Sequence, residues 1–350
     1  MKIAVLLSGG VDSSVALRLL HREGHELTAF YLKIWLEDEL AFLGECPWEA
    51  DLRFARSVCK QIGVPLEIVP LQQEYLARVV THALDELRLG RTPSPDIFCN
   101  QRIKFGAFVE LLDPELATVA SGHYARLDRR GEHPTLRCGC DPVKDQTYFL
   151  SHLGADQLHR LCFPIGEFSK AEVRSLAAEF ELCNQDRPDS QGICFLGKIS
   201  YRDFVAFHLG EKEGKIVELD SGEVLGKHRG YWFHTIGQRH GLALSGGPWY
   251  VVGKAVDENV IYVAHGNRIE AHGRRVFETG PFNWISEHPS TSQLRVKLRH
   301  GPDFHECTVE RTRAGGIRVS LEAPDMGVAP GQHAVLYEGD SCLGGGVISY

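Results

Sequence analysis

The ten cysteines of this 350-residue sequence include no C-x-x-C pair, and no apolar run reaches the ~20 residues that a membrane-spanning helix needs. The missing pairs argue against a structural zinc site, because such sites usually take ligands from pairs of this kind. No basic leader with a cleavage site precedes the first apolar run, and there is no internal repeat or low-complexity segment. We therefore expect a cytoplasmic protein with no membrane partner and no metal site made of protein ligands alone.

An excess of positive charge is also missing, because the formal net charge is −8. A protein that coats nucleic acid without specificity would carry the opposite sign. Local basic groups nevertheless occur in the C-terminal half, at 227–229, 239–240, 274–275 and 295–300. With 43% hydrophobic and 24% charged residues the composition is that of an ordinary globular protein, and the length predicts two or three domains.

Apolar runs and amphipathic segments alternate in the first part of the chain. Runs typical of strands lie at 3–7, 27–32 and 66–69, and the apolar residues between Leu52 and Ile62 recur at helical spacing. Strands that alternate with helices predict a parallel sheet with right-handed crossovers. Ligands of such open sheets bind beyond the carboxyl ends of the strands.

The pattern changes further along the chain. A helix is expected at about 74–87, whereas two prolines predict an ordered loop without regular structure at 91–100. Ser169 and Glu172 form the pattern of a capping box, which predicts a helix start. From about Lys215 the helical periodicity ends, and short β-rich runs separated by turns follow.

We therefore predict an α/β fold class with three domains. A parallel, doubly wound domain is expected at 1–200, a small central β-rich domain at 201–267, and a C-terminal antiparallel barrel or sandwich at 268–350.

The most informative stretch joins the first strand to the following helix and reads S-G-G-V-D-S-S at 8–14. Its two glycines let the backbone turn sharply, and Ser13 and Ser14 place hydroxyls beside the free N–H groups of a helix N-terminus. Such a loop binds anions, most often phosphate. A third spaced glycine and a lysine before the serines are missing, which excludes the dinucleotide fingerprint and the common P-loop. The alternative interpretation is a helix N-cap with a glycine-rich turn.

Asp96, Cys99 and Cys194 are candidates for chemistry. Cysteine is the best nucleophile among side chains and the only one that carries a persulfide, provided that its surroundings lower the thiol pKa from ~8.5. A carboxylate near it could transfer protons. The alternative is two small buried thiols and a turn aspartate, and the residue types and spacing leave both interpretations open.

The loop resembles the pyrophosphate loop of the ATP pyrophosphatase family, which cleaves ATP between its α- and β-phosphates. Six further motifs follow it in order. They are G-R-T-P-x-P-D-I-x-C-N from 90, S-G-H-Y from 121, K-D-Q-x-Y-F-L from 144, D-S-x-G-I-C-F from 189, H-T-I-G-Q-R-x-G-L from 234, and P-G-Q with C-L-G-G-G between 330 and 346. Together the seven motifs resemble the tRNA-specific 2-thiouridylases over nearly the whole chain, which implies an adenine nucleotide α-hydrolase-like N-terminal domain and a C-terminal β-barrel.

The resemblance implies an ATP site, a sulfur-transfer site and a tRNA-binding surface. The implied ATP-binding residues are Leu6, Leu7, Ser8, Gly9, Gly10, Val11, Asp12, Ser13, Ser14, Leu32 and Gly122. Cys99 is the implied nucleophile, Cys194 the implied persulfide carrier, and Asp96 a candidate acid or base. The implied tRNA-binding residues are Ser94, Pro95, Asp96, Lys144, Asp145, Gln146, Arg299 and His300.

The implied reaction replaces O2 of the wobble uridine of tRNA with sulfur. ATP and Mg²⁺ are the implied cofactors, with Asp12 as a candidate metal ligand, and uridine O2 attacks the α-phosphate while pyrophosphate leaves. The Cys194 persulfide then supplies sulfur to C2. Cys99 either attacks C2 or closes a disulfide with Cys194 that frees the sulfur, and the sequence leaves both orders open. The implied partners are the tRNA anticodon arm, from which the base must be extruded, and a persulfide-donating sulfur-carrier protein.

Three positions depart from the usual pattern of that family. Ser94 stands where Asn is usual and keeps a hydrogen-bonding group, and Leu32 stands where Met is common and keeps apolar bulk. His300 replaces a frequent Tyr, and its imidazole can stack or bind phosphate but lacks the phenol.

Two other functions would use parts of the same pattern. An amide-forming ligase or a lysidine-type tRNA synthetase with the same loop would use an amine nucleophile, so it would survive serine at both cysteine positions. A non-catalytic RNA-binding module that uses ATP as a conformational ligand would release no pyrophosphate with unmodified tRNA.

Overall fold

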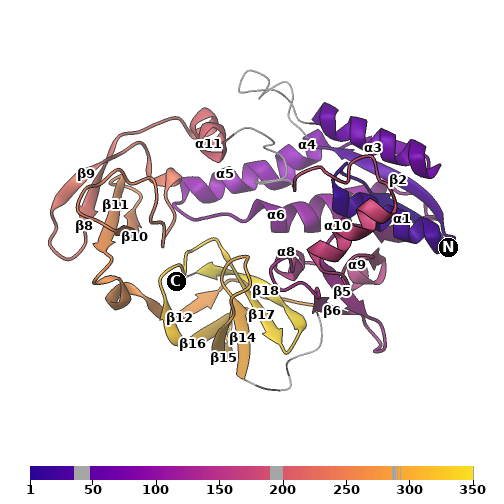
Figure 1. The fold of residues 1–350 in the computed structure, drawn as a ribbon. Helices are drawn as coiled ribbons and strands as arrows, with labels where there is room; N and C mark the ends of the chain where they lie inside the picture. Colours follow the sequence, from indigo (N-terminus) through magenta and orange to yellow (C-terminus); the bar gives the residue numbers. More distant parts are fainter. Residues whose placement is uncertain (35–47, 190–199, 286–288, 290, 292, 350) are drawn as a thin grey trace.

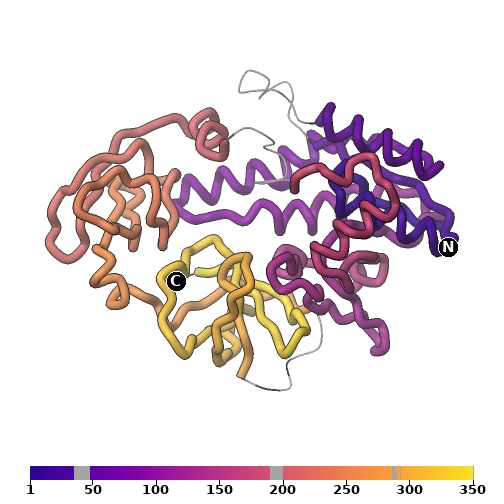
Figure 2. The backbone as a smooth tube through the Cα atoms, in the orientation of Figure 1, coloured from indigo at the N-terminus to yellow at the C-terminus, as the bar shows by residue number. Residues whose placement is uncertain are grey.

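The structure describes residues 1–34, 48–189, 200–285, 289, 291 and 293–349. In these ranges the chain forms three β-sheets, two long helical segments and several shorter helices. In this computed structural model the N-terminal sheet lies at one end and the central sheet at the other, with the C-terminal barrel below the helical segments that run between them (Figure 1). The backbone tube shows the same arrangement (Figure 2). None of the helices in these ranges combines the length and the apolar character that a membrane crossing requires.

The N-terminal sheet is parallel, as the alternating pattern predicts. Its order is β3-β2-β1-β4-β7, with β1 at Lys2–Leu6, β2 at Glu26–Lys33, β3 at Leu66–Pro70, β4 at Thr118–Ala120 and β7 at Leu161–Cys162. Register between β1 and β2 places Leu6 opposite Phe30, so both strands end at the same edge of the sheet. The loop that follows β1 therefore emerges at the carboxyl edge, as expected.

Helices cover both faces of this sheet. On one face Val5 packs with α1 (Val11–Arg22), α3 (Trp48–Ile62) and α10 (Lys170–Glu179). On the other face Leu6 packs with a long helical segment formed by α4 (Gln72–Tyr75), a π-helical stretch (Leu76–Val80) and α5 (Thr81–Arg88). The N-terminal domain is therefore doubly wound, and the predicted α/β fold class is confirmed.

The second helical segment corrects the prediction for 91–100. Residues 91–94 have no regular secondary structure, as predicted, but from Pro95 the chain forms α6 (Pro95–Phe98) and continues through η3, a π-helix at Cys99–Ala107, into α7 (Phe108–Leu111). Proline breaks a helix only in its interior, whereas Pro95 occupies the first turn, where its missing N–H costs nothing. Cys99 consequently lies in a helix rather than in a loop.

The central part contains one helix and a small mixed sheet. Helix α11 (Tyr201–Leu209) comes first, and the sheet has the order β10-β11-β8-β9, with β8 at Gly214–Glu218, β9 at Val224–His228, β10 at Trp249–Ala255 and β11 at Val260–His265. Two hydrogen bonds join this part to the end of α5: the Tyr231 hydroxyl donates to the Arg88 carbonyl, and Lys254 Nζ donates to the Gly90 carbonyl.

The C-terminal strands form an antiparallel barrel. They are β12 (Arg274–Thr279), β14 (Gln293–Lys297), β15 (His305–Arg311), β16 (Ile317–Asp325), β17 (His333–Glu338) and β18 (Ser341–Ser349). Because β12 pairs with both β16 and β18, the sheet closes on itself. This resolves the choice between barrel and sandwich that the sequence left open.

A hairpin from the N-terminal domain extends the barrel sheet, which the sequence did not indicate. Strands β5 (Ala125–Asp128) and β6 (Thr135–Cys138) lie beside β18, where Ser341 pairs with Arg137. One hydrophobic cluster likewise runs from the helices of the N-terminal domain, including Phe98 and Cys99, into the barrel at Tyr337. The two domains therefore share a packed interface.

Candidate functional site

The 8–14 loop closes around the first turn of α1. The Gly10 carbonyl accepts hydrogen bonds from Ser13 Oγ at 3.0 Å and from Ser14 Oγ at 2.9 Å, and the Ser8 amide donates to Ser13 Oγ at 3.3 Å. The serine hydroxyls therefore fix the shape of the loop at the start of the helix, where free backbone N–H groups attract anions.

Two glycines permit close backbone contacts at this loop. Gly9 has a φ of +78°, and a Cβ there would lie 2.2 Å from the Asp51 carbonyl oxygen. A Cβ on Gly122 would lie 2.7 Å from the Ser13 nitrogen. Any side chain at Gly122 would consequently displace the first turn of α1, which places this predicted residue directly against the loop.

The apolar residues of the expected ATP site lie at the ends of two neighbouring strands. Leu6 and Leu7 are buried at the end of β1, and the Leu7 amide donates to the Phe30 carbonyl of β2. Leu32 is partly buried in β2, opposite Val69 of β3, and packs against the core. It therefore lies beside the carboxyl edge from which the loop emerges.

An ion network around Lys170 joins distant motifs beside the loop. Lys170 Nζ contacts Asp12 Oδ1 and Asp189 Oδ1, each at 2.7 Å. Asp12 Oδ1 also accepts a hydrogen bond from the Tyr124 hydroxyl at 2.9 Å, and Lys144 Nζ contacts Asp189 Oδ2 at 2.8 Å. The network thus connects the loop, the S-G-H-Y segment, the K-D-Q segment and the start of the D-S-x-G-I-C-F segment.

These charges shift two pKa values in opposite directions. Burial and the neighbouring Asp12 carboxylate raise the pKa of Tyr124 far above its ordinary value, so its hydroxyl stays a hydrogen-bond donor. Burial alone would raise the pKa of Asp189, but hydrogen bonds from Lys144 and Lys170 outweigh it and hold the pKa below its usual range. Asp189 is therefore an anion that can organise several cations.

The sequence did not single out four of the residues that brace this site. Besides Lys170, they are Arg174, which contacts Asp189 at 2.6 Å, and Asn184 and Arg187, which donate to the Gly9 carbonyl at 2.9 and 3.0 Å. The only available signal was indirect, because Lys170 opens the helix that the Ser169 capping box predicts. A single cation that reaches a loop far away in the chain has no periodicity to detect.

Asp96 and Cys99 lie one helical turn apart at the start of the second helical segment. Cys99 is completely buried, and Asp96 Oδ1 is buried without a hydrogen-bond partner among the described residues. Asn100, next along the helix, donates from Nδ2 to the Phe149 carbonyl at 3.0 Å and so ties this helix to the K-D-Q segment. Cys194, the other predicted cysteine, lies outside the described residues.

The K-D-Q segment differs in role from residue to residue. Asp145 is only 2% exposed, and its carboxylate accepts from the Gly139 amide at 3.1 Å and from Lys297 Nζ of the barrel at 2.9 Å, with Lys297 itself 1% exposed. The Gln146 side-chain oxygen accepts from the Tyr124 amide at 3.0 Å. Lys144 and Gln146 remain partly exposed, whereas the Asp145 carboxylate is wholly engaged inside the protein.

Two further predicted residues, Arg299 and His300, follow β14 and lie beside the K-D-Q segment. His300 Nε2 donates to the Asp145 carbonyl at 3.1 Å, and its ring stacks on Phe149 with centroids 4.6 Å apart. Burial lowers the pKa of His300, against the raising effect of the Asp145 carbonyl and of the Asp145 and Asp96 carboxylates. Arg299 pairs with Asp325 at 2.9 Å and keeps 55% of its side chain exposed.

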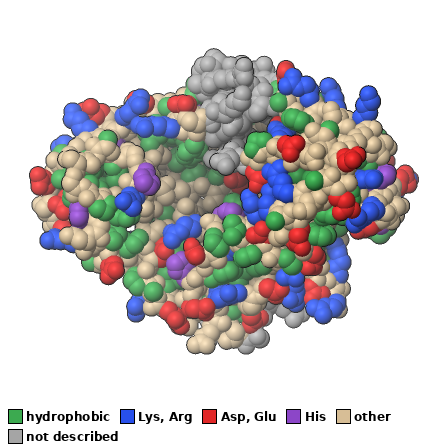
Figure 3. All heavy atoms as spheres, viewed as in Figure 1, with side chains coloured by type: hydrophobic (Ala, Val, Ile, Leu, Met, Phe, Trp, Pro, Cys, Tyr) green, Lys and Arg blue, Asp and Glu red, His purple; other side chains and the backbone are tan. Residues whose placement is uncertain are grey.

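Two groups of residues therefore lie around the K-D-Q segment. The first consists of the 8–14 loop, Gly122 and the ion network around Lys170. The second consists of Asp96 and Cys99, at the start of the second helical segment, together with His300. The surface is hollowed between the parts of the chain on the face that Figure 3 shows, and basic and histidine side chains border the hollow. In the described ranges no three His, Cys, Asp or Glu side chains lie close enough together to hold a metal ion.

Known proteins resemble this chain from end to end. Family models match residues 1–198 (tRNA methyl transferase HUP domain), 202–265 (tRNA methyl transferase PRC-barrel domain) and 274–348 (Aminomethyltransferase beta-barrel domain). The tRNA-specific 2-thiouridylase MnmA 1 of Bacteroides thetaiotaomicron is 44% identical over 356 residues, which cover 100% of both chains. The tRNA-specific 2-thiouridylase MnmA of Parabacteroides distasonis is 44% identical over 99% of both chains.

A third relative, the tRNA-specific 2-thiouridylase MnmA of Porphyromonas gingivalis, is 42% identical over 100% of this chain and 99% of its own. Among solved structures, a 4-thiouridine synthetase–RNA complex with bound ATP aligns with 55% of this chain and 44% of that one, at 16% identity and a TM-score of 0.34. This structural similarity is too low to carry an argument.

Proposed function

This chain belongs to the family of tRNA-specific 2-thiouridylases, and from that premise we propose that it replaces O2 of the wobble uridine of tRNA with sulfur in an ATP-dependent reaction. The observation that carries the proposal is the ion network around Lys170. It connects the anion-binding loop, through Asp12, to Asp189 at the start of the segment that contains Cys194. Adenylation and sulfur transfer would need these segments side by side.

We propose that the 8–14 loop and the first turn of α1 hold the departing pyrophosphate of ATP while uridine O2 attacks the α-phosphate. The α1 N–H groups and the Lys170 ammonium group would stabilise the charge that leaves, so Lys170 would supply the cation that the loop itself lacks. Asp12 Oδ2 has no hydrogen-bond partner among the described residues, so this oxygen is available to a Mg²⁺ ion, which would neutralise phosphate charge.

Sulfur transfer would follow on the activated base. The terminal sulfur of a Cys194 persulfide bonds to C2, and O2 leaves as part of AMP. The Cys99 thiolate then attacks Sγ of Cys194, and the electrons of the broken S–S bond form the C2 thiocarbonyl, so that a Cys99–Cys194 disulfide remains for a dithiol to reduce. Attack of Cys99 on C2 itself is the alternative order. Asp96, one turn before Cys99, is our candidate for proton transfer.

Cys99 must become accessible for either order. Its side chain is fully buried in the described form of the chain, so we propose that tRNA binding moves the α6 start and opens this site. Extrusion of the base from the anticodon arm would supply the group that enters.

We assign tRNA contact to Ser94, Lys144, Gln146 and Arg299, which are all partly exposed around the K-D-Q segment. Asp145 instead fixes the shape of this surface through its buried contacts. The anticodon arm as the docking element, a sulfur-carrier protein as the donor, and a cytoplasmic location stay predictions.

An oxygen-transfer experiment tests the proposal. The enzyme is incubated with ATP, Mg²⁺, a persulfide donor and tRNA whose target uridine carries heavy oxygen at O2. We expect the label in AMP and in no other product. A Cys194→Ser variant should release pyrophosphate and leave the tRNA adenylated, with neither AMP nor thiolated tRNA formed. Label retained in the tRNA, with normal thiolation, would exclude adenylation at O2.

A further inference from the structure

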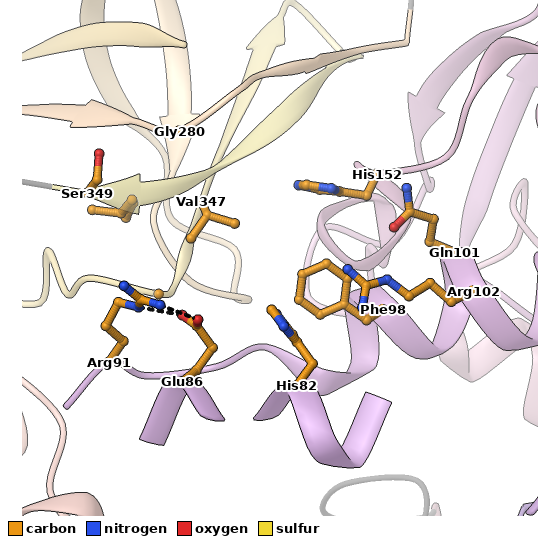
Figure 4. Close-up of a pocket in the computed structure, with 12 residues that line it drawn as sticks. His82, Glu86, Arg91, Phe98, Gln101, Arg102, His152, Gly280, Val347 and Ser349 are labelled. Carbon is orange, nitrogen blue, oxygen red and sulfur yellow. Dashed lines mark hydrogen bonds and ion pairs between the residues drawn. The ribbon is translucent and has the colours of Figure 1, made fainter. Parts of the chain in front are cut away.

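A cavity of about 420 Å³ lies between the helices of the N-terminal domain and the edge of the C-terminal barrel. One wall carries His82 of α5, Phe98 and Arg102, and the opposite wall is the backbone and side chains at 347–349 of β18 (Figure 4). We call it the interdomain cavity. No residue of the 8–14 loop, the K-D-Q segment or the ion network lines it.

The charged side chains that line the interdomain cavity leave an excess of positive charge. Glu86 and Arg91 form a two-point pair with each other, with Arg91 Nε 2.7 Å from Glu86 Oε2. The Arg102 guanidinium carbon lies over the Phe98 ring, 4.0 Å from its centroid, and Arg102 donates to the Arg78 carbonyl at 2.8 Å. Within the described ranges Arg102 makes no ion pair. Among the residues that the structure describes, the Arg102 guanidinium group is therefore partly buried in the cavity without a counterion.

Three imidazoles surround this guanidinium group. His82 and His152 line the cavity and point into it in Figure 4. His333 of β17 lies behind them, completely buried, with its ring 4.6 Å from that of His152. Both ring nitrogens of His333 and Nε2 of His152 have no hydrogen-bond partner among the described residues, although buried polar atoms are normally paired.

We propose that the interdomain cavity binds a phosphate group, carried either by a free phosphate anion or by the tRNA backbone. A guanidinium fork and imidazole N–H groups are the donors that tetrahedral oxyanions recognise, and partial burial strengthens such charge-assisted hydrogen bonds. The cavity is also larger than one phosphate group, so it leaves room for the molecule to which that group is attached.

The electrostatics agree with this ligand. Burial, followed by the Arg102 charge, lowers the pKa values of His82 and His152, that of His152 to about 4. Burial and the neighbouring imidazoles do the same to His333. Among the groups that face these rings, Glu86 opposes the shift and Arg91 adds to it. A bound anion would offset the positive potential.

Phe98 connects the interdomain cavity to the helix that carries Cys99. Phe98 contacts Arg102, His82, His152 and His333, and it directly precedes Cys99 in the chain. An anion bound at Arg102 would therefore be separated from Cys99, the proposed nucleophile, by Phe98.

Titration with inorganic phosphate, followed through the histidine ring signals in NMR spectra of the full chain, tests the proposal. The His82 and His152 signals are assigned with His82→Gln and His152→Gln variants. Because both rings line the interdomain cavity, their shifts report binding there and not anion binding at the 8–14 loop. We expect saturable shifts of these signals, and in Arg102→Gln a dissociation constant at least ~10-fold higher.

Two variants control for folding and for charge. Arg88→Gln removes the same charge from an exposed position of α5 that pairs with Asp85, and it should leave the shifts unchanged. Arg102→Lys keeps the charge and should bind phosphate more weakly than the wild type but better than Arg102→Gln, even where loss of the guanidinium contact with Phe98 lowers stability. Absence of saturable shifts in the wild type, or equal shifts in Arg102→Gln, would overturn the proposal.

Binding of unmodified tRNA distinguishes the two phosphate sources and uses the tRNA substrate of the proposed function. If the phosphate belongs to tRNA, Arg102→Gln lowers tRNA affinity, reduces the slope of log K against log salt by about 0.7–0.9, and tRNA displaces inorganic phosphate. If the ligand is a free anion, tRNA affinity stays within about twofold while the phosphate shifts are lost in Arg102→Gln. Failure of tRNA thiolation would leave the phosphate titration unaffected.

Discussion

Replacing Lys297 with methionine should uncouple the C-terminal barrel from the K-D-Q segment. Lys297 Nζ lies 2.9 Å from Asp145 Oδ2, and both side chains are almost completely buried. Methionine keeps the length and much of the volume of lysine but removes the charge, so the Asp145 carboxylate would stay buried without its cation.

The size of the effect follows from this burial. At 2.9 Å and an effective dielectric constant of ~20, the attraction within the pair is about 6 kcal/mol. Part of this gain offsets the desolvation of both groups, and removal of one partner of a buried pair costs about 3–5 kcal/mol. For a domain of this size we expect the melting temperature of the barrel to fall by roughly 12–40 °C.

Differential scanning calorimetry and tRNA binding measure the consequence. Lys297→Met should melt earlier and bind tRNA more weakly than the wild type. The double variant Asp145→Asn/Lys297→Met has no charge left to bury and should regain most of the stability and affinity. If the double variant binds tRNA as poorly as Asp145→Asn alone, Asp145 contacts tRNA directly and our assignment of its role is wrong.

Three further predictions follow from single sites. Gly122→Ala should raise the KM for ATP at least ~10-fold, because its Cβ would lie 2.7 Å from the Ser13 nitrogen; an unchanged KM in steady-state kinetics would separate Gly122 from the nucleotide site. Alkylation of Cys99 by iodoacetamide, read by peptide mass analysis, should accelerate at least ~10-fold when tRNA binds, and equal rates would refute the proposed opening. Burial lowers the pKa of Lys254 to about 8, so folding stability should rise relative to Lys254→Met as pH increases from about 8 to 10.5 in chemical denaturation, and a constant difference would contradict the linkage.

Short-range sequence patterns predicted the strands and helices whose formation depends on neighbouring residues. The alternation of apolar runs and amphipathic segments led to the parallel sheet, and the spacing of Ser169 and Glu172 led to the capping box, whose two hydrogen bonds the structure contains. The helix at 95–98 was missed because proline was weighed as a breaker rather than as a first-turn residue.

Long-range contacts account for what the sequence could not predict. The pairing of β6 with β18, the reach of Lys170 to Asp12 and the burial of Asp145 by Lys297 each join residues that are more than a hundred positions apart. No periodicity or spacing encodes such pairs. The motifs located the site residues, but only the tertiary structure separates a buried brace such as Asp145 from a partly exposed neighbour such as Lys144.

Mass analysis of the nucleosides of unmodified tRNA, after incubation with the full chain, ATP, Mg²⁺ and a persulfide donor, tests the central claim most directly. We predict that the wobble uridine exchanges one oxygen for one sulfur, that the product depends on ATP, and that Cys99→Ser and Cys194→Ser each abolish it. A wobble uridine that gains no sulfur, or thiolation that persists without ATP or in both cysteine variants, would contradict the account.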